Sequence, residues 1–159
     1  MEYLFWKLIH ITSVIMFLGN IITGLFWAAR AHKSRDFKMI STTFQNIIKS
    51  DRYFTGPGVL GITISGFAAA INGGFPILGT GWIFWGIVLF SISGIIFGIY
   101  VAPLQKKIYK FANAVGTSEN EWKVYEKLYK QWEIWGFLAT ITPIGAMAIM
   151  VLKPFLPGL

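Results

Sequence analysis

The chain of 159 residues contains no cysteine, and only 13% of its residues are charged, whereas 55% are hydrophobic. Without cysteine it can form neither a disulfide scaffold nor a zinc or iron–sulfur site held by thiolates. Asp, Glu, Lys and Arg are missing from three long runs, residues 8–29, 53–105 and 134–152. Because about 20 apolar residues cross the bilayer core, these runs hold one, two and one spans. This composition excludes an ordinary soluble domain and predicts an all-α bundle of four transmembrane helices.

The predicted spans cover about residues 4–29, 53–71, 82–101 and 133–152, within a single integral membrane domain of residues 1–159. Apolar residues keep helical spacing beyond the spans, at 37–47, 104–115 and 122–132, so we expect the helices to extend beyond the bilayer. Ser118 and Glu121 have the spacing of a capping box, which would start the last helix before it enters the membrane.

The basic residues predict how the bundle is oriented. Of the 14 Lys and Arg, six lie between Arg30 and Arg52, and six lie between Lys106 and Lys130. Four spans place both segments on the same side, which the positive-inside rule assigns to the cytoplasm, so both termini are predicted outside and the helices extend into the cytoplasm. Topology and lipid headgroups account for the net charge of +7, so the expected partner is the lipid bilayer, and no nucleic acid is expected.

A stripe of polar side chains runs along the first span. Helical spacing places Lys7, His10, Ser13 and Asn20 on one face, which we expect to point toward the other helices because polar groups are costly in lipid. Two interpretations of His10 stay open. It either forms a hydrogen bond to a Ser or Thr across the bundle, or it ligates haem iron or copper, or relays protons.

The two histidines limit the metal chemistry. His10 and His32 are separated by 22 residues, about 33 Å along one helix, so they cannot sandwich one haem. A haem would therefore depend on His10 alone, or on His10 with a different sixth ligand, and His32 is expected to face solvent or headgroups. Met16, Met147 and Met150 could supply soft ligands to copper, although methionines in spans also serve as packing residues.

Charged residues also lie at the ends of three spans. Arg30, Arg52 and Glu133 end or begin spans one, two and four on the same side, and we expect Glu133 to pair with one of the arginines. This cluster would be either a structural ion pair or a clamp for a propionate, a phosphate or another anionic headgroup.

The third span contains a GxxxG pair, Gly94 and Gly98. Small residues at this spacing let helices approach closely in lipid, so this face could hold a second copy of the chain or a membrane partner.

Several short segments together resemble a known family. They are Leu8-Ile9-His10-Ile11 in the first span, residues 52–57 (RYFTGP) at the start of the second, and Ser65-Gly66 within it. This pattern resembles a bacterial family of small predicted integral membrane proteins of unknown function. That family is similar to the superfamily of copper-resistance D-like proteins, which includes the J-type membrane protoporphyrinogen oxidase. The resemblance implies a bacterial cytoplasmic (inner) membrane protein in which His10 matches the position of a b-type haem ligand.

The leading functional hypothesis is therefore a bundle that binds haem b, or a related tetrapyrrole, through His10 for redox or electron-transfer chemistry. Lys7 would reach the propionates, and Ser13 and Asn20 would lie on the same face of the pocket. Two alternatives stay open, a cofactor-free scaffold or accessory subunit, and a copper or small-solute carrier. The sequence assigns no catalytic residue.

Overall fold

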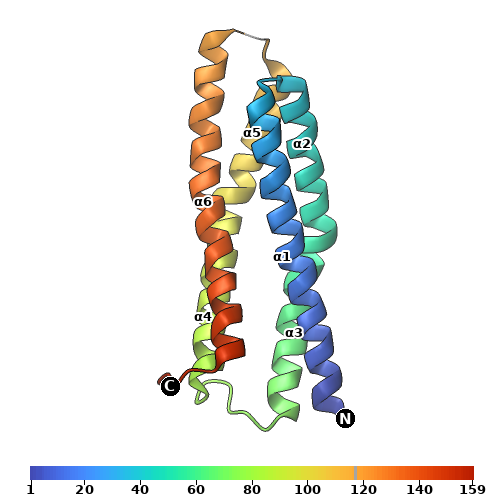
Figure 1. Cartoon of the computed structure of the whole chain (residues 1–159), viewed down its shortest axis with the longest axis vertical. Coiled ribbons are helices and arrows are strands. Elements are labelled where there is room, and N and C mark those ends of the chain that lie inside the picture. Colours follow the sequence, from blue (N-terminus) through green and yellow to red (C-terminus); the bar gives the residue numbers. More distant parts are fainter. Residues whose placement is uncertain (117) are drawn as a thin grey trace.

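The computed structural model describes residues 1–116 and 118–159, and this part of the chain is helical without a strand. Four long rods lie side by side, with the N- and C-termini at the same end (Figure 1). Each rod contains a helix that is long and apolar enough to cross a membrane, which confirms the prediction of a four-span, all-α bundle. The elements in chain order are α1 (Glu2–Ser34), α2 (Phe37–Ser50), η1 (Asp51–Thr55), α3 (Gly56–Asn72), α4 (Gly81–Ile96), η2 (Phe97–Val101), α5 (Ala102–Ala114) and α6 (Glu119–Leu152).

The ends of the rods are defined by local hydrogen bonds. Asp36 begins α2 because its carboxylate accepts a hydrogen bond from the backbone N–H of Lys38 at 2.8 Å. At the start of α6 the Ser118 hydroxyl accepts from the N–H of Glu121 at 3.3 Å, and the Glu121 carboxylate accepts from the N–H of Ser118 at 2.9 Å. The predicted capping box is thus confirmed.

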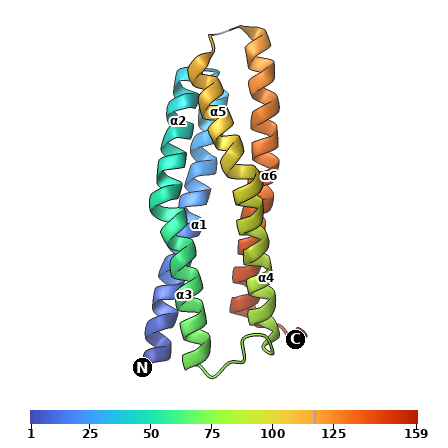
Figure 2. The ribbon, with the colours of Figure 1, turned by 180° about the vertical axis from the view of Figure 1, so that it is seen from behind.

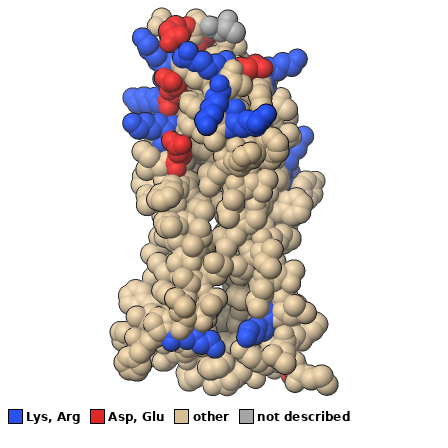
Figure 3. Space-filling view, in the orientation of Figure 1, with Lys and Arg blue, Asp and Glu red and all other residues tan. Residues whose placement is uncertain are grey.

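Beyond the predicted spans, the four rods form a compact helical bundle that we call the basic end. Its core comes from the apolar stripes of α2, α5 and α6, and Ile40, Phe44, Ile108 and Tyr125 are fully buried there. Lys and Arg side chains gather on the surface of this end (Figure 3). With 33 residues, α1 is about 50 Å long, whereas the hydrocarbon core is about 30 Å thick. The predicted extension of the helices beyond the bilayer is therefore confirmed.

In the other half, the rods separate into two pairs, α1 with α3 and α4 with α6 (Figure 2). Glycines on α3 let α1 approach closely. A Cβ added at Gly61 would lie 3.0 Å from Cβ of Ser13, and one added at Gly66 would lie 3.1 Å from Cε1 of His10. This close approach of small residues is typical of helix packing in lipid, where no hydrophobic effect between helices drives association.

The two pairs meet near the middle of the molecule. The rings of Phe17 on α1 and Phe90 on α4 make an edge contact with centroids 5.7 Å apart. Phe17 belongs to a small apolar cluster that also includes Leu18 and Ile62, which is separate from the larger core of the basic end.

Two π-helical turns interrupt the second and third rods. The N–H of Gly56 donates to the carbonyl of Asp51, and the N–H of Ala102 donates to the carbonyl of Phe97, which are the i+5 bonds of a π-helix. Each π-helix is followed two residues later by a proline, Pro57 or Pro103. A proline removes one helical N–H and clashes with the carbonyl four residues before it, so a wider turn accommodates it inside a continuous rod.

The second rod runs without a break from Phe37 to Asn72, because the π-helix lets the chain stay helical through Pro57. The helix therefore begins 16 residues before Tyr53, where the predicted membrane span begins.

Candidate ligand-binding site

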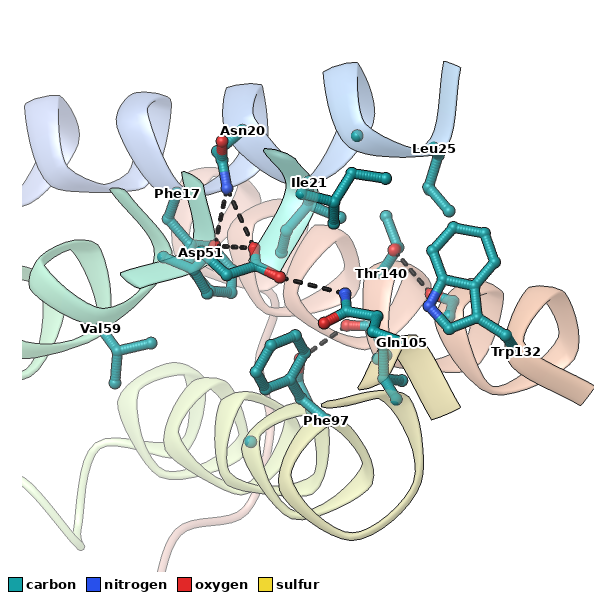
Figure 4. A pocket seen from close by; sticks show the side chains of 18 of the residues that line it. Phe17, Asn20, Ile21, Leu25, Asp51, Val59, Phe97, Gln105, Trp132 and Thr140 are labelled. Atoms are coloured by element: carbon teal, nitrogen blue, oxygen red, sulfur yellow. Dashed lines mark hydrogen bonds between the residues drawn. The ribbon is translucent and has the colours of Figure 1, made fainter. Parts of the chain in front are cut away.

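A cavity of about 80 Å³ lies at the level of the two π-helices and is lined by residues from all four rods (Figure 4). Most of its wall is apolar and includes the rings of Phe17, Phe90 and Phe97. The cavity adjoins the contact between Phe17 and Phe90, where the two helix pairs meet. It therefore lies inside the bundle rather than on its lipid-facing surface.

One wall of the cavity carries a half-buried carboxylate, that of Asp51 at the start of η1. Its Oδ1 accepts hydrogen bonds from Nδ2 of Asn20 at 3.1 Å and from Oγ1 of Thr55 at 2.7 Å. Its Oδ2 accepts a third from Nε2 of Gln105 at 3.0 Å. Nδ2 of Asn20 also donates to Oγ1 of Thr55 at 2.9 Å. We call these four residues the Asp51 network, and Figure 4 shows its hydrogen bonds.

The Asp51 network joins three rods. Asn20 comes from α1, Asp51 and Thr55 come from η1, and Gln105 comes from α5. Thr55 and Gln105 are 5% and 4% exposed, so their polar atoms depend on these bonds. The network thus fixes the relative position of the rods at the cavity.

All three donors to Asp51 are neutral. Residues 1–116 and 118–159 contain one salt bridge, which does not involve Asp51. It joins the exposed side chains of Arg35 and Glu119 at 3.9 Å. Removing a carboxylate from water is costly, and hydrogen bonds from neutral groups offset only part of that cost. An ionisable side chain in this position is a candidate functional residue.

The opposite part of the cavity wall offers an unused hydrogen-bond donor. Trp132 on α6 is 3% exposed, lines the cavity, and its buried indole Nε1–H has no hydrogen-bond partner in the described part of the chain. In Figure 4 the indole lies beside Thr140 and faces toward Gln105. The hydroxyl of Thr140, by contrast, donates within its own helix to the carbonyl of Gly136 at 2.7 Å. Trp132 is therefore the free donor of this wall.

His10 lies outside this cavity, in the half where α1 packs on α3. Its Nδ1 donates to the backbone carbonyl of Ile62 at 3.0 Å, and Oγ of Ser65 lies 3.5 Å from the same nitrogen. The ring packs against Gly66. The bond to Ile62 assigns the proton to Nδ1 and leaves the lone pair of Nε2 for another partner.

The other members of the predicted polar stripe have different environments. Ser13 is buried against Gly61, and Asn20 joins the Asp51 network. Lys7 is exposed, with its Nζ 5.8 Å from the ring centroid of Tyr3. The structure thus turns His10, Ser13 and Asn20 toward other helices, as the stripe predicted, and leaves Lys7 at the surface.

The structure does not bring Arg30, Arg52 and Glu133 together. All three are exposed, and no salt bridge joins them in the described residues. Trp132 faces the core, so the next residue, Glu133, points about 100° away from it around α6. The prediction considered where the helices end, but it did not consider which way each side chain faces.

His32 is not a freely solvated residue, which corrects the prediction. It lies beyond the predicted first span, half-buried against the aromatic stripe of α6. Its ring stacks on Tyr129 with centroids 4.1 Å apart and planes 2° from parallel, and its Nδ1 lies 3.3 Å from the hydroxyl of Tyr125. Burial lowers the pKa of His32, and the nearby carboxylates of Glu126 and Glu133 partly oppose this effect. Burial also raises the pKa of Tyr129 to about 12.

Met150, one of the three predicted copper donors, and the GxxxG pair have different surroundings in the structure. Met150 packs against Gly86, and the described residues contain no group of three or more His, Cys, Asp or Glu placed to hold a metal ion. Cβ atoms added at Gly94 and Gly98 would meet no heavy atom within 4 Å, so this pair does not pack the helices of one chain together.

The Asp51 network was not predicted from the sequence. One signal was present, because Asp51 is the single acidic residue between Asp36 and Glu119. It also lies two residues before the charge-free run 53–105, of which Gln105 is the last residue. An isolated carboxylate beside a span is a reason to look for buried partners.

Comparison with known proteins places the chain in a family. No curated protein and no solved structure matched it. A family model described as "Predicted integral membrane protein (DUF2269)" matches residues 4–154, which is nearly the whole chain and includes the Asp51 network and His10. The protein therefore belongs to this family of integral membrane proteins.

Proposed function

We propose that the protein binds a small solute in the cavity beside Asp51 and serves as a membrane-embedded solute-binding or carrier protein. The observation that carries this proposal is a half-buried carboxylate, held by three neutral donors, on the wall of a cavity lined by all four rods. Ligand sites are mostly apolar cavities in which a few polar groups fix the orientation of the ligand. The Asp51 network and the free donor of Trp132 are such groups.

The backbone around the cavity supports the same proposal. The π-helices η1 and η2 both contribute lining residues, Asp51 and Thr55 from the first and Phe97 and Val101 from the second. Single π-helical turns inside longer helices are frequent at functional sites. Binding sites of many transporters also lie where membrane helices depart from regular α-helical geometry.

The test uses the purified full chain in detergent and three two-carbon solutes, ethylammonium, ethanol and acetate. We expect at least one of them to bind saturably, as measured by isothermal titration calorimetry. Asp51→Asn should weaken that binding at least tenfold. The matched control is Asp36→Asn, because Asp36 is exposed and asparagine caps a helix as well as aspartate does. Absence of binding for all three solutes, or equal binding by both variants, would reject the proposal.

A second candidate is the binding of haem b, or a related tetrapyrrole, through His10, with a role in redox or electron-transfer chemistry. The observation that favours it is the hydrogen bond from Nδ1 to the carbonyl of Ile62, because a histidine that ligates a metal usually donates its other ring N–H in this way. A haem would be held by one imidazole, with Nε2 of His10 as the ligand and Lys7 one turn away for a propionate. Haem would supply the redox chemistry.

The test of this second candidate is an absorption spectrum of protein purified from haem-replete cells. A Soret band that disappears in His10→Ala, while a thermal melt shows that the variant still folds, would support it. A wild-type preparation without a Soret band would reject it, and metal analysis of the same sample would report on copper. A colourless protein that binds no solute and purifies with a fixed partner would instead favour the scaffold alternative.

A further inference from the structure

We infer that the ligand of the cavity is a small protonated amine whose ammonium group binds Asp51. This inference rests on the proposed function and specifies its substrate class. It follows from the donor and acceptor positions that the Asp51 network leaves unused, from the absence of a salt bridge between Asp51 and any Lys or Arg in the described residues, and from the size and lining of the cavity.

The donors and acceptors of the Asp51 network favour a ligand that donates hydrogen bonds. A carboxylate offers about four acceptor positions, and three of those on Asp51 are used. Both N–H groups of Asn20 and the hydroxyl hydrogen of Thr55 are also used within the network. The unused groups beside Asp51 are two acceptors, one position on the carboxylate and the side-chain carbonyl of Gln105, and one donor, the second N–H of Gln105. A ligand that donates hydrogen bonds matches the two acceptors.

The charge of Asp51 favours a ligand that is a cation. The partners of Asp51 are two amides and a hydroxyl, and no Lys or Arg forms a salt bridge with it in the described residues. A cation that binds here would therefore remove the largest cost of burying the carboxylate, whereas an anion would add to it. The aromatic rings of Phe17, Phe90 and Phe97 at the cavity also favour a cation, through the negative faces of their π-systems.

The small number of oxygen ligands in the cavity favours an organic cation over a metal ion. Ions such as Ca²⁺ and Mg²⁺ take six or more oxygen ligands. The Asp51 network supplies fewer, and most of the remaining wall is hydrocarbon. An amine needs only two or three acceptors for its ammonium group, and its carbon atoms can contact the apolar wall.

The size of the cavity restricts the amine. Its volume of about 80 Å³ is roughly half that of the 150 Å³ cavity known to bind benzene in another protein. An amine of about two to four non-hydrogen atoms fits this space. Ethylammonium and ethanolamine are therefore suitable probes.

Trp132 adds a preference within this class. Its free indole N–H can donate to a ligand acceptor, and ethanolamine has a hydroxyl oxygen that ethylammonium lacks. One hydrogen bond between neutral groups changes affinity by about two- to tenfold. We expect ethanolamine to bind more tightly than ethylammonium by this factor.

The experiment measures the affinities of ethylammonium, ethanolamine, ethanol and acetate for the full chain in detergent at pH 7. In the wild-type protein both amines should bind at least tenfold more tightly than ethanol, and acetate should bind most weakly. Asp51→Asn should abolish the preference for amines over ethanol. Trp132→Phe should remove the advantage of ethanolamine over ethylammonium.

Trp122→Phe is the matched control, because Trp122 is also buried with an unpartnered indole N–H but does not line the cavity. It should retain the advantage of ethanolamine. The wild-type comparison of amines with ethanol needs no variant, so it decides the question even if a substitution prevents folding. Ethanol or acetate binding as tightly as the amines would overturn this inference and leave the proposed function standing. No binding by any solute would overturn both.

Discussion

Replacing Asn20 by alanine removes two hydrogen bonds from the Asp51 network at once. Nδ2 of Asn20 donates to the carboxylate of Asp51 at 3.1 Å and to the hydroxyl of Thr55 at 2.9 Å. A hydrogen bond to a charged group contributes about 1.5–3 kcal/mol, and one between neutral groups about 0.5–1.5 kcal/mol. We therefore expect Asn20→Ala to lower the free energy of unfolding by about 2–4 kcal/mol.

Asn72 provides the matched control for this prediction. Its Nδ2 donates to the backbone carbonyl of Ala68 at 2.8 Å, but the residue is exposed at the end of α3. Asn72→Ala should change the free energy of unfolding by no more than about 0.5 kcal/mol. The assay is reversible unfolding in mixed micelles with increasing dodecyl sulfate, followed by circular dichroism. Equal effects of the two substitutions would refute the conclusion that the Asp51 network is a buried and stabilising feature.

Three further predictions concern other parts of the molecule. Gly66→Ala should destabilise the protein by about 1–3 kcal/mol, because the new Cβ would press on the ring of His10, whereas Gly19→Ala, which meets no heavy atom within 4 Å, should be neutral or stabilising in the same assay. Ser118→Ala should cost about 0.5–2 kcal/mol through loss of the cap. Hydrogen bonds from Ser118 lower the pKa of Glu121, so this carboxylate stabilises the fold above pH 4.5. The stabilisation should disappear as the pH falls through the lower pKa of the folded state. A contribution of the cap that does not change down to pH 2 would contradict this. The pKa of His32, measured from its ring proton signals by NMR, should lie below 6.5. The folded state favours the neutral ring, so this contribution to stability should be lost as the pH falls from 6.5 through the lower pKa of the folded state. A pKa above 6.5 would contradict the stacking of the half-buried ring on Tyr129.

The fold could be predicted from the sequence because its main signals are local. The charge-free runs gave the four spans, and the spacing of Phe37, Ile40, Phe44 and Ile47 gave the buried face of α2. The capping box at Ser118 depends on two residues only three positions apart. Each of these features can be read within one or two helical turns.

The site could be predicted only in part, because its contacts join distant segments. Asn20 was identified as part of a polar stripe, but its partner Asp51 is 31 residues away, and Gln105 is a further 54 residues along the chain. The π-helices also determine which side chains face the cavity. A search for apolar residues at 3.6 residues per turn assumes a regular α-helix, so it does not predict these turns. For the same reason, the positions of Arg30, Arg52 and Glu133 at helix ends did not predict that all three would face outward.

The central claim can be tested directly by NMR, because the chain contains two aspartates, Asp36 and Asp51. Protein labelled with ¹³C at the aspartate carboxyl carbons should give one signal from each residue. Titration with ethylammonium should shift the Asp51 signal saturably and leave the Asp36 signal in place. Asp36 is exposed and caps the N-terminal end of α2, whereas Asp51 lies at its C-terminal end. If both signals stay fixed, or if both shift linearly without saturation, the Asp51 cavity is not a site for a small amine.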